Sequence, residues 1–161
     1  KKSAGHPTHQ LLGAPNCCMA SLLARVLKTL IGRGSLQHQA WIVVGDAGVD
    51  ELTLHGTSHV WHVTGYSISR TCVTPSAFGV RPIPYALLPG GDANTNARVF
   101  LDIVYGRKKG AARDMVALNA GAVFAMIGKT KCIRDGYAHA LSSIKDGSVG
   151  RHFDHFRRAF S

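Results

Sequence analysis

Two adjacent acidic residues follow a short apolar segment in the first half of the sequence. Residues 43–56 read VVGDAGVDELTLHG, and the two adjacent acids in this stretch are Asp50 and Glu51. The chain has nine acidic residues, and Glu51 is its only glutamate. Neighbouring carboxylates repel each other unless a cation screens them, and oxygen ligands of this kind suit Mg²⁺. The pair is therefore a candidate metal site.

The position of this pair after an apolar run strengthens the prediction of a ligand site. The run AWIVVG at 40–45 is short, unbroken and rich in β-branched residues, which predicts a strand covered on both faces. Ligands of open α/β sheets bind beyond the carboxyl ends of the strands, where Asp46, Asp50 and Glu51 would lie. The alternative is a solvated turn whose acids balance nearby arginine and lysine. Composition alone does not decide between the two.

A second glycine-rich acidic stretch, LLPGGDANTNA at 87–97, precedes a predicted helix. Paired glycines before a helix N-terminus can form an anion site. The stretch lacks, however, the GK[ST] of a P-loop and the glycine spacing of GxGxxG. We therefore favour a structural role, in which Asp92 or Asn94 caps the helix that follows.

Two pairs of histidines have a spacing that raises the question of metal binding. His59 and His62 are three residues apart in a predicted strand, so they should lie on opposite faces and cannot share a metal. His152 and His155 could share one face of a helix, but no further ligand is apparent. Surface positions are the favoured interpretation of both pairs.

Composition indicates a globular chain of one domain. It has 161 residues, of which 45% are hydrophobic and 17% charged, enough for a real core. No apolar run is long enough to span a bilayer, so no membrane partner is expected. The four cysteines lack the CxxC spacing of zinc sites, and Cys17-Cys18 has no obvious base beside it. We expect reduced, buried thiols in a cytoplasmic protein.

The chain carries a formal net charge of +10, with a pI of about 9.9. Such a surface attracts the phosphates of nucleic acids, nucleotides or sugar phosphates. The basic residues are dispersed, and the only tight cluster is GRKKGAAR at 106–113. Dispersed charge is more typical of a solvated face than of a groove, which makes nucleic acid the less favoured partner.

The elements that would position these residues begin with a helix. Apolar residues recur at helical spacing before Gly32 and Gly34, which predicts an amphipathic helix. The predicted apolar face consists of Met19, Leu22, Leu23, Val26, Leu27, Leu30 and Ile31. The buried strand at 40–45 follows this helix and is expected to be parallel. Residues 58–75 carry TGYS between two short apolar runs, which predicts a hairpin.

The second half of the chain is predicted to be helical after a proline-rich loop. Four prolines between residues 75 and 89 exclude a long helix there. Helices are expected at 95–105, at about 111–127 and from Ile133 to Ile144. Their predicted apolar faces are Ala97, Phe100, Leu101 and Val104 in the first, Met115, Leu118, Ala122 and Met126 in the second, and Ile133, Tyr137, Ala140, Leu141 and Ile144 in the third. A short last helix should carry Phe153, Phe156 and Phe160. One buried strand and a hairpin are few for a doubly wound domain, so the predicted class is α/β with an incomplete sheet.

Several segments in this order resemble anthranilate phosphoribosyltransferase. The most specific are GVDE, GGDANTNA and RDMVALNA, and the resemblance runs from about residue 10 to about residue 149. It corresponds to the C-terminal half of the family's chain. It implies a nucleoside-phosphorylase-like phosphoribosyltransferase fold. Residues 1–161 would form a single α/β domain, a central sheet with flanking helices, that matches the family's C-terminal glycosyltransferase domain.

The family's reaction implies a role for the acidic pair. These transferases join anthranilate to the ribosyl C1 of phosphoribosyl pyrophosphate (PRPP), a step of tryptophan biosynthesis, with Mg²⁺ on the diphosphate. The resemblance implies that Asp50 and Glu51 match the family's metal-binding acids. In a reaction through an oxocarbenium-like ribosyl centre, charge stabilisation on the leaving pyrophosphate matters more than a nucleophilic side chain.

Other parts of the family's site are not present in this sequence. The GTGGD diphosphate loop, the KHGN segment, the anthranilate-binding histidine and arginine and the N-terminal helical domain all precede the matched region in the family. No catalytic or substrate-binding residue is therefore assigned, and the chain alone is expected to be inactive or weakly active. A complementary N-terminal half or another copy of the chain would complete the site, or the chain is a remnant.

Two alternatives to a role in phosphoribosyl transfer stay open. The first is a non-catalytic basic relative of the family that binds nucleic acid. The net charge and the cluster at 106–113 favour it, whereas Asp50 and Glu51 count against it. The second is a catalytically silent scaffold that keeps the fold and partners the missing half.

Overall fold

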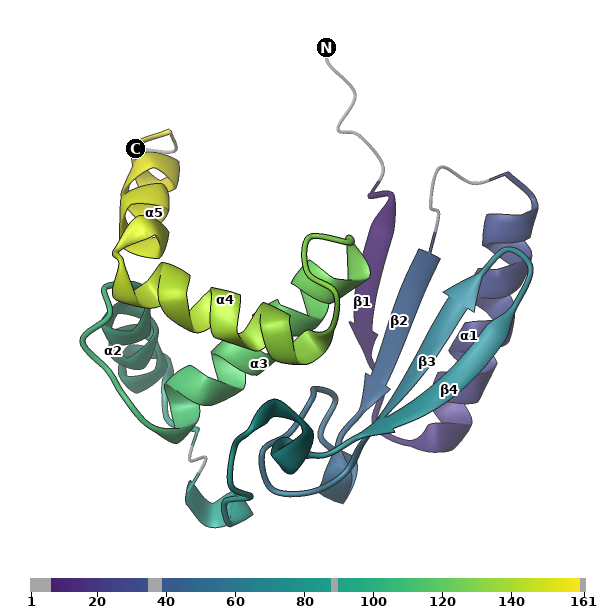
Figure 1. Ribbon diagram of the computed structural model, residues 1–161, viewed down its shortest axis with the longest axis horizontal. Coiled ribbons are helices and arrows are strands. Elements are labelled where there is room, and N and C mark those ends of the chain that lie inside the picture. The colour runs from purple at the N-terminus through teal and green to yellow at the C-terminus, as the bar shows by residue number, and fades with distance from the viewer. Residues whose placement is uncertain (1–6, 35–38, 88–89, 160–161) are drawn as a thin grey trace. The chain divides into compact units, whose positions relative to one another are not determined.

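The computed structural model describes residues 7–34, 39–87 and 90–159, divided between two compact units. The first unit ends at Val80 and the second begins at Arg81. Figure 1 shows strands and one helix in the first unit and helices in the second. Among the described helices, none is both long enough and apolar enough to cross a membrane. The expectation that residues 1–161 form one domain stays a prediction.

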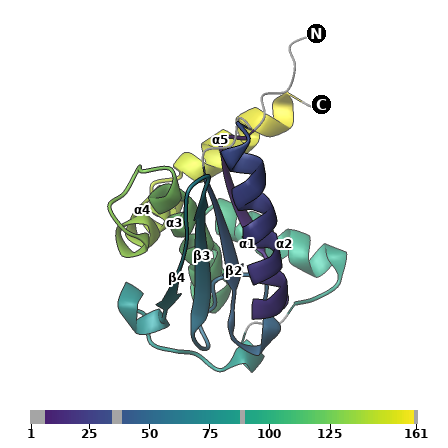
Figure 2. The ribbon, with the colours of Figure 1, turned by 90° about the vertical axis from the view of Figure 1, so that its right-hand side faces the viewer.

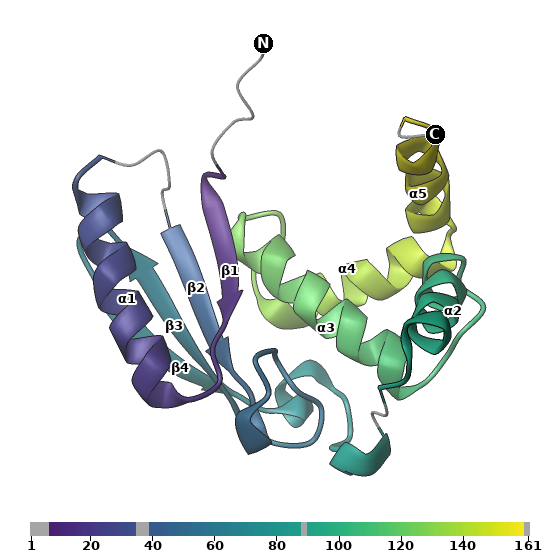
Figure 3. The same cartoon turned by 180° about the vertical axis from the view of Figure 1, so that it is seen from behind.

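The described part of the first unit is a four-stranded sheet with one helix packed on it. Its elements are β1 (His9–Gly13), α1 (Cys17–Gly32), β2 (Gln39–Val44), β3 (Ser58–Thr64) and β4 (Ile68–Val73). The strands lie side by side in chain order (Figure 3). β1 and β2 are parallel, with Leu11 opposite Trp41, and the other two pairs are antiparallel.

The predicted buried strand and the predicted hairpin are both confirmed. β2 follows α1 and is parallel to its neighbour β1, and β3 and β4 form the hairpin around TGYS. β1 was not predicted, because HQLLG contains only two adjacent apolar residues, fewer than the four to eight that typify a buried strand. The α/β class is confirmed, with one parallel pair of strands in place of a single strand.

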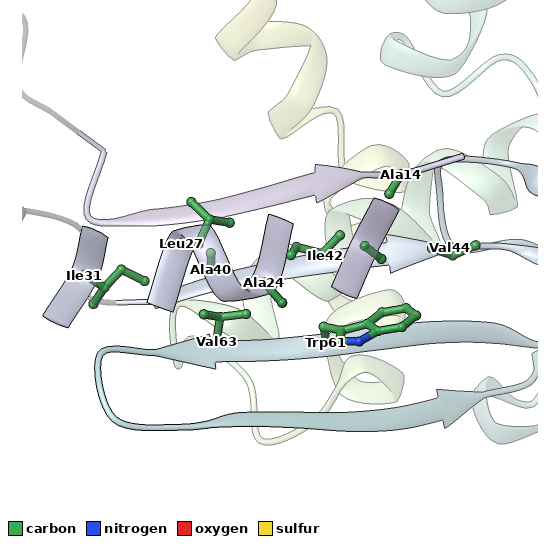
Figure 4. Packing of buried hydrophobic residues seen from close by; sticks show 10 residues of the cluster. Ala14, Ala24, Leu27, Ile31, Ala40, Ile42, Val44, Trp61 and Val63 are labelled. Atoms are coloured by element: carbon green, nitrogen blue, oxygen red, sulfur yellow. The ribbon is translucent and has the colours of Figure 1, made fainter. Parts of the chain in front are cut away.

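The core of the first unit lies between α1 and the sheet. Figure 2 shows α1 running along the strands, and Figure 4 shows apolar side chains of both layers turned toward each other. The cluster includes Ala20, Ala24, Leu27 and Ile31 from α1 and Ala40, Ile42, Val44, Trp61 and Val63 from the sheet. Burial of this apolar surface is the main force that holds the helix on the strands.

The face of α1 that packs on the sheet differs from the predicted one. Leu27 and Ile31 are buried as expected, and Leu23 is partly buried. The other four predicted residues, Met19, Leu22, Val26 and Leu30, are between 42% and 49% exposed. The contact runs instead through Ala20 and Ala24, because small side chains let the helix approach the strands closely. A prediction based on the spacing of large apolar residues does not identify these alanines as the contact face.

The second unit is helical, as predicted. Its helices are α2 (Ala93–Val104), α3 (Ala111–Met126), α4 (Ile133–Lys145) and α5 (Ser148–Arg158). In the predicted loop before them, the described residues form only short 3₁₀ turns, Pro75–Phe78 and Tyr85–Leu87. α3 and α4 touch backbone to backbone: a Cβ on Gly121 would overlap the Tyr137 nitrogen, and one on Gly136 the Gly121 carbonyl oxygen.

The buried faces of these helices agree only in part with the predicted ones. Leu118 in α3 and Ile144 in α4 are buried as expected. In α2, Ile103 is buried, whereas Phe100 is 50% exposed and lies edge-on to Phe153 of α5, with ring centroids 5.4 Å apart. An aromatic ring can therefore cover a neighbouring helix without entering the core. Phe160 lies outside the described residues.

The expectation of buried cysteines is wrong. The thiols are unbridged, but Cys18, Cys72 and Cys132 are exposed and Cys17 is only partly buried. Their places in the fold give the reason. Cys17, Cys18 and Cys132 lie at the starts of helices, and Cys72 lies in β4, which pairs with a neighbour on only one described side.

Candidate metal centre

The segment after β2, residues 46–57, is called the acid loop here because it carries Asp46, Asp50 and Glu51. Its backbone lies directly against the carboxyl ends of β1 and β2. A Cβ on Gly13, the last residue of β1, would overlap the Asp50 carbonyl oxygen. A Cβ on Gly45, which follows β2, would lie 2.5 Å from the Glu51 carbonyl oxygen. Both strands therefore need glycine at this end, and the predicted location of the acids is confirmed.

The first turn of the acid loop explains why Asp46 differs from the other two acids. Ala47 has a φ of 57°, in the left-handed region that residues with a side chain rarely adopt. The Asp46 side chain stabilises this turn, because its Oδ1 accepts a hydrogen bond of 2.9 Å from the Ala47 N–H. The same carboxylate packs against Gly56, where a Cβ would overlap it. Asp46 therefore serves the loop's own backbone.

Hydrogen bonds join residues of the acid loop to one another and to the flanking residues Gly45 and Ser58. The Gly45 N–H donates to the Val49 carbonyl at 2.6 Å. At the far end, the Thr53 N–H donates to Ser58 Oγ at 2.9 Å, which ties the loop to the start of β3. Thr53 Oγ1 contacts His55 Nδ1, and His55 Nε2 lies 3.0 Å from the Asp46 carbonyl oxygen. Asp50 and Glu51 lie on the segment that these bonds enclose.

Partial burial and the neighbouring Asp50 together set the direction of the pKa shift of Glu51. Both residues are exposed at the surface, yet the atoms packed around the Glu51 carboxylate desolvate it enough to raise its pKa. The negative charge of Asp50 raises the pKa of Glu51 further, as the second cause. A neighbouring cation would lower the pKa again, because it favours the ionised carboxylate.

The donor set fits Mg²⁺ better than a metal held wholly by protein. Within residues 7–34, 39–87 and 90–159, no three His, Cys, Asp or Glu side chains converge as metal ligands would. Zinc sites need three or four such side chains. Mg²⁺ keeps several waters and is commonly held by one or two carboxylates together with substrate phosphates. Asp50 and Glu51 could supply those two carboxylates.

The second glycine-rich stretch has the structural role that the sequence favoured. Asp92 caps α2: its Oδ1 accepts a hydrogen bond of 2.7 Å from the Thr95 N–H. Asn96 bonds both the N–H and the carbonyl of Gly91, at 3.0 Å and 2.8 Å. The hydrogen bond from the Thr95 backbone is the largest of the causes that lower the pKa of Asp92. The Asp92 carboxylate therefore serves as the N-cap of α2.

The histidine pairs are not brought together as metal ligands. His59 Nδ1 lies 3.1 Å from Cys72 Sγ, and His62 Nε2 lies 2.8 Å from Thr71 Oγ1, on the opposite face of β3 as predicted. His62 is half-buried, and this burial lowers its pKa. The other pair lies exposed on α5, as expected of surface histidines.

The basic cluster at 106–113 is partly neutralised by neighbouring acids. Arg107 Nε lies 3.0 Å from Asp102 Oδ1, and the Arg107 guanidinium also lies 5.0 Å from the centre of the Tyr105 ring. Arg113 Nη2 lies 2.6 Å from Asp114 Oδ1. Two of the four cations of this cluster are therefore paired within the second unit, which reduces its attraction for phosphates.

Three residues of the site were missed in the sequence: Gly13, Thr53 and His55. Gly13 repeats the pattern of Gly45, a glycine directly after an apolar pair, and this repetition is the signal that could have identified it. Thr53 and His55 give no such signal, because their role depends on a contact with the Asp46 carbonyl nine residues before His55. Local spacing does not reveal a bond to a backbone oxygen.

Comparison with known proteins agrees with this architecture. The model of a family described as glycosyl transferase family, a/b domain, matches residues 2–149. A curated anthranilate phosphoribosyltransferase from Brevibacillus brevis is 37% identical over 150 residues, which are 93% of this chain and 42% of that protein. The chain thus spans about two fifths of the length of such relatives.

Solved structures of the same enzyme are similar in fold. Anthranilate phosphoribosyltransferase from Thermus thermophilus is 28% identical with a TM-score of 0.76, over 89% of this chain and 40% of that one. The enzyme from Saccharomyces cerevisiae in complex with PRPP and Mg is 23% identical with a TM-score of 0.82, over 94% and 42%. At 23% identity this second likeness concerns the fold alone.

Proposed function

The chain belongs to the glycosyl transferase family through its a/b domain, and on that premise we propose that it contributes the metal-binding acids to anthranilate phosphoribosyl transfer. The reaction class would be transfer of a phosphoribosyl group from PRPP to anthranilate, in tryptophan biosynthesis. Asp50 and Glu51 would hold Mg²⁺. A cytoplasmic location, where the unbridged cysteines would stay reduced, is part of the same proposal.

One observation carries this proposal: the raised pKa of Glu51 next to Asp50 at the carboxyl ends of β1 and β2. Perturbed carboxylates at the strand ends of an α/β sheet are typical of ligand sites. The curated relative at 37% identity is an anthranilate phosphoribosyltransferase, which supports the choice of reaction.

The chemistry of the reaction accounts for two carboxylates at this place. Bound Mg²⁺ would neutralise charge on the pyrophosphate that leaves the ribosyl carbon. Asp50 and Glu51 would fix the position of that charge, and the glycines under the acid loop would fix the position of the two acids. A preformed arrangement of this kind stabilises developing charge without reorganisation during the reaction.

The site would be completed by a second polypeptide segment. Relatives are more than twice as long as this chain, and the acid loop alone offers no group that would recognise anthranilate. We therefore include in the proposal a complementary N-terminal portion, either on another chain or outside the sequence described, or a second copy of the chain. Residues 1–161 alone would have weak activity or none.

Calorimetric titration of Mg²⁺ in the presence of PRPP tests the metal site. The wild type is compared with a double variant, Asp50→Asn with Glu51→Gln, which keeps size and removes both charges. Asp92→Asn is the matched control, because asparagine caps helices about as well as aspartate. We expect binding in the wild type and in the control, and its loss in the double variant. Equal binding in all three proteins would overturn the metal role.

An activity assay tests the reaction separately. Anthranilate and PRPP are supplied to this chain, to the N-terminal portion of a relative that precedes the matched region, and to a mixture of both. The proposal predicts turnover in the mixture only, and the loss of that turnover with the double variant. Equal turnover in mixtures made with the wild type and with the Asp50→Asn, Glu51→Gln variant would contradict the proposal.

A further inference from the structure

Of the two buried polar residues of the described chain, Thr53 lies near the end of the acid loop and Ser58 directly follows the loop as the first residue of β3. Thr53 and Ser58 are each 1% exposed, and no other polar or charged residue of the described ranges is buried to this degree. Polar groups are buried only at a cost unless they are hydrogen-bonded. Both are bonded here: Ser58 Oγ accepts from the Thr53 N–H, and Thr53 Oγ1 contacts His55 Nδ1.

The polarity of this chain of bonds can be assigned from its ends. His55 Nε2 lies 3.0 Å from the Asp46 carbonyl oxygen, which can only accept, so Nε2 carries a proton and donates. Thr53 Oγ1 accepts from the His55 backbone N–H at 3.3 Å, which leaves its own hydroxyl proton for His55 Nδ1. A neutral imidazole protonated at Nε2 satisfies every one of these contacts.

The Asp46 carbonyl is the point where these bonds meet the start of the acid loop. It accepts from His55 Nε2 at 3.0 Å and from the Val49 N–H at 3.4 Å. Val49 directly precedes Asp50 in the sequence. The His55 ring therefore links Asp46, at the start of the acid loop, to the end of the loop, just before β3. The two candidate ligands lie among the six residues between Asp46 and Thr53.

We propose that Thr53 and His55 are positioning residues for the metal site. They hold the acid loop in the form that presents Asp50 and Glu51 to one cation. Neither touches the metal in this proposal. It rests on the metal role proposed above, and adds that the ligands' geometry depends on the hydroxyl of Thr53 and the ring of His55. Outer-shell partners of this kind commonly change metal affinity by about 10-fold to 100-fold when they are lost.

Electron paramagnetic resonance of Mn²⁺ in the presence of inorganic pyrophosphate tests this role. Mn²⁺ stands in for Mg²⁺, and the fraction bound is read without any enzymatic turnover. The informative variant is Thr53→Val, which keeps the shape of the side chain and removes the hydroxyl. Thr53→Ser restores the hydroxyl, and Thr57→Val removes one from an exposed position of the same loop.

We expect Thr53→Val to weaken Mn²⁺ binding by at least about 10-fold, and Thr53→Ser and Thr57→Val to bind nearly as the wild type does. If Thr53→Val binds like Thr57→Val while the wild type binds well, the positioning role is wrong and the metal role stands. If the wild type itself binds no Mn²⁺, the metal role fails and the positioning role fails with it.

A second measurement applies to the wild type and does not depend on how the variants fold. ¹⁵N chemical shifts of the His55 ring report which nitrogen carries the proton. The bond chain predicts that the neutral ring, observed in alkaline solution, carries its proton on Nε2. A ring protonated on Nδ1 under these conditions would be incompatible with donation to the Asp46 carbonyl, and would overturn the proposed arrangement.

Discussion

The acid loop and the stretch around Asp92 are both glycine-rich, acidic and placed next to a regular element, but their carboxylates behave in opposite ways. Desolvation and the charge of Asp50 raise the pKa of Glu51. Hydrogen bonds from the first turn of α2 lower the pKa of Asp92. Repulsion from Asp50 thus acts on Glu51, whereas backbone N–H groups at the start of α2 stabilise the charged form of Asp92.

This difference separates an acid whose charged form the fold disfavours from one whose charged form the fold stabilises. A capping aspartate is stabilised by the donors that a helix start leaves unpaired, so it needs no ion. Desolvation and the adjacent charge of Asp50 instead disfavour the charged form of Glu51. The repulsion can persist because the close approach of the acid loop to Gly13 and Gly45 holds the backbone in place.

The largest effect is expected from Gly13→Ala. The added Cβ would overlap the Asp50 carbonyl oxygen, so the acid loop must move away from the end of β1. Overpacking of this kind costs about 1–3 kcal/mol of unfolding free energy. We expect chemical denaturation to show a loss of this size, and Mg²⁺ titration to show no binding.

Gly90→Ala is the matched control for this substitution. Nothing lies within 4 Å of the position that its Cβ would take, so stability and Mg²⁺ binding should stay close to those of the wild type. Equal stability of the Gly13 and Gly90 variants would mean that the acid loop does not lie against β1 as described.

A smaller effect is expected from Asp92→Ala. α2 loses the acceptor for the Thr95 N–H, so thermal unfolding should begin at a lower temperature, while Mg²⁺ binding stays unchanged. Because the pKa of Asp92 is lowered by folding, its contribution is present above its ordinary pKa and is lost as the pH falls through the folded value. Thermal melts at neutral and acidic pH measure both effects.

If Asp92 acts as a helix cap, the asparagine variant should behave differently from the alanine variant. Asp92→Asn should keep most of the stability, because asparagine supplies the same acceptor, but should lose the pH dependence. A decline of Mg²⁺ binding in either variant would remove the contrast between the two stretches.

The smallest effect, and opposite in sign, is expected from Glu51→Gln. A raised pKa means that the stability associated with Glu51 is present at low pH and is lost as the pH rises through the folded pKa. The glutamine variant avoids that loss, so without metal it should be more stable than the wild type at neutral pH. The gain should stay below about 1 kcal/mol, because solvent screens the exposed carboxylate.

The control for this prediction is a comparison of the wild type and the Glu51→Gln variant at acidic pH. There Glu51 is protonated, and denaturation curves of the two proteins should converge. A glutamine variant that is less stable than the wild type at neutral pH, in the absence of metal, would show that the Glu51 charge is already compensated by the protein.

The sequence was sufficient for features that depend on local patterns. The run at 40–45, the TGYS turn and the helical spacing of the second half predicted β2, the hairpin and the four later helices. The placement of Asp50 and Glu51 beyond a strand end follows from the same run. Each of these predictions needs only the period of the apolar residues and the turn residues around them.

What the sequence did not supply depends on contacts distant along the chain. Ala20 and Ala24 face the sheet because the sheet comes close, which no helical periodicity of large residues reveals. β1 is a strand because it pairs with β2, which follows it in the sequence only after the whole of α1. The bond from His55 to the Asp46 carbonyl is of the same kind, since a ring that meets a backbone oxygen leaves no trace in residue spacing.

The most direct test of the account uses the fact that Glu51 is the only glutamate of the chain. Selective ¹³C labelling of glutamate gives one side-chain carboxyl signal, which is titrated with pH by NMR, first without metal and then with Mg²⁺ and pyrophosphate. The account predicts a pKa above the ordinary glutamate value without metal and a marked fall when the ion is added. A Glu51 that titrates at its ordinary value and does not respond to Mg²⁺ would contradict it.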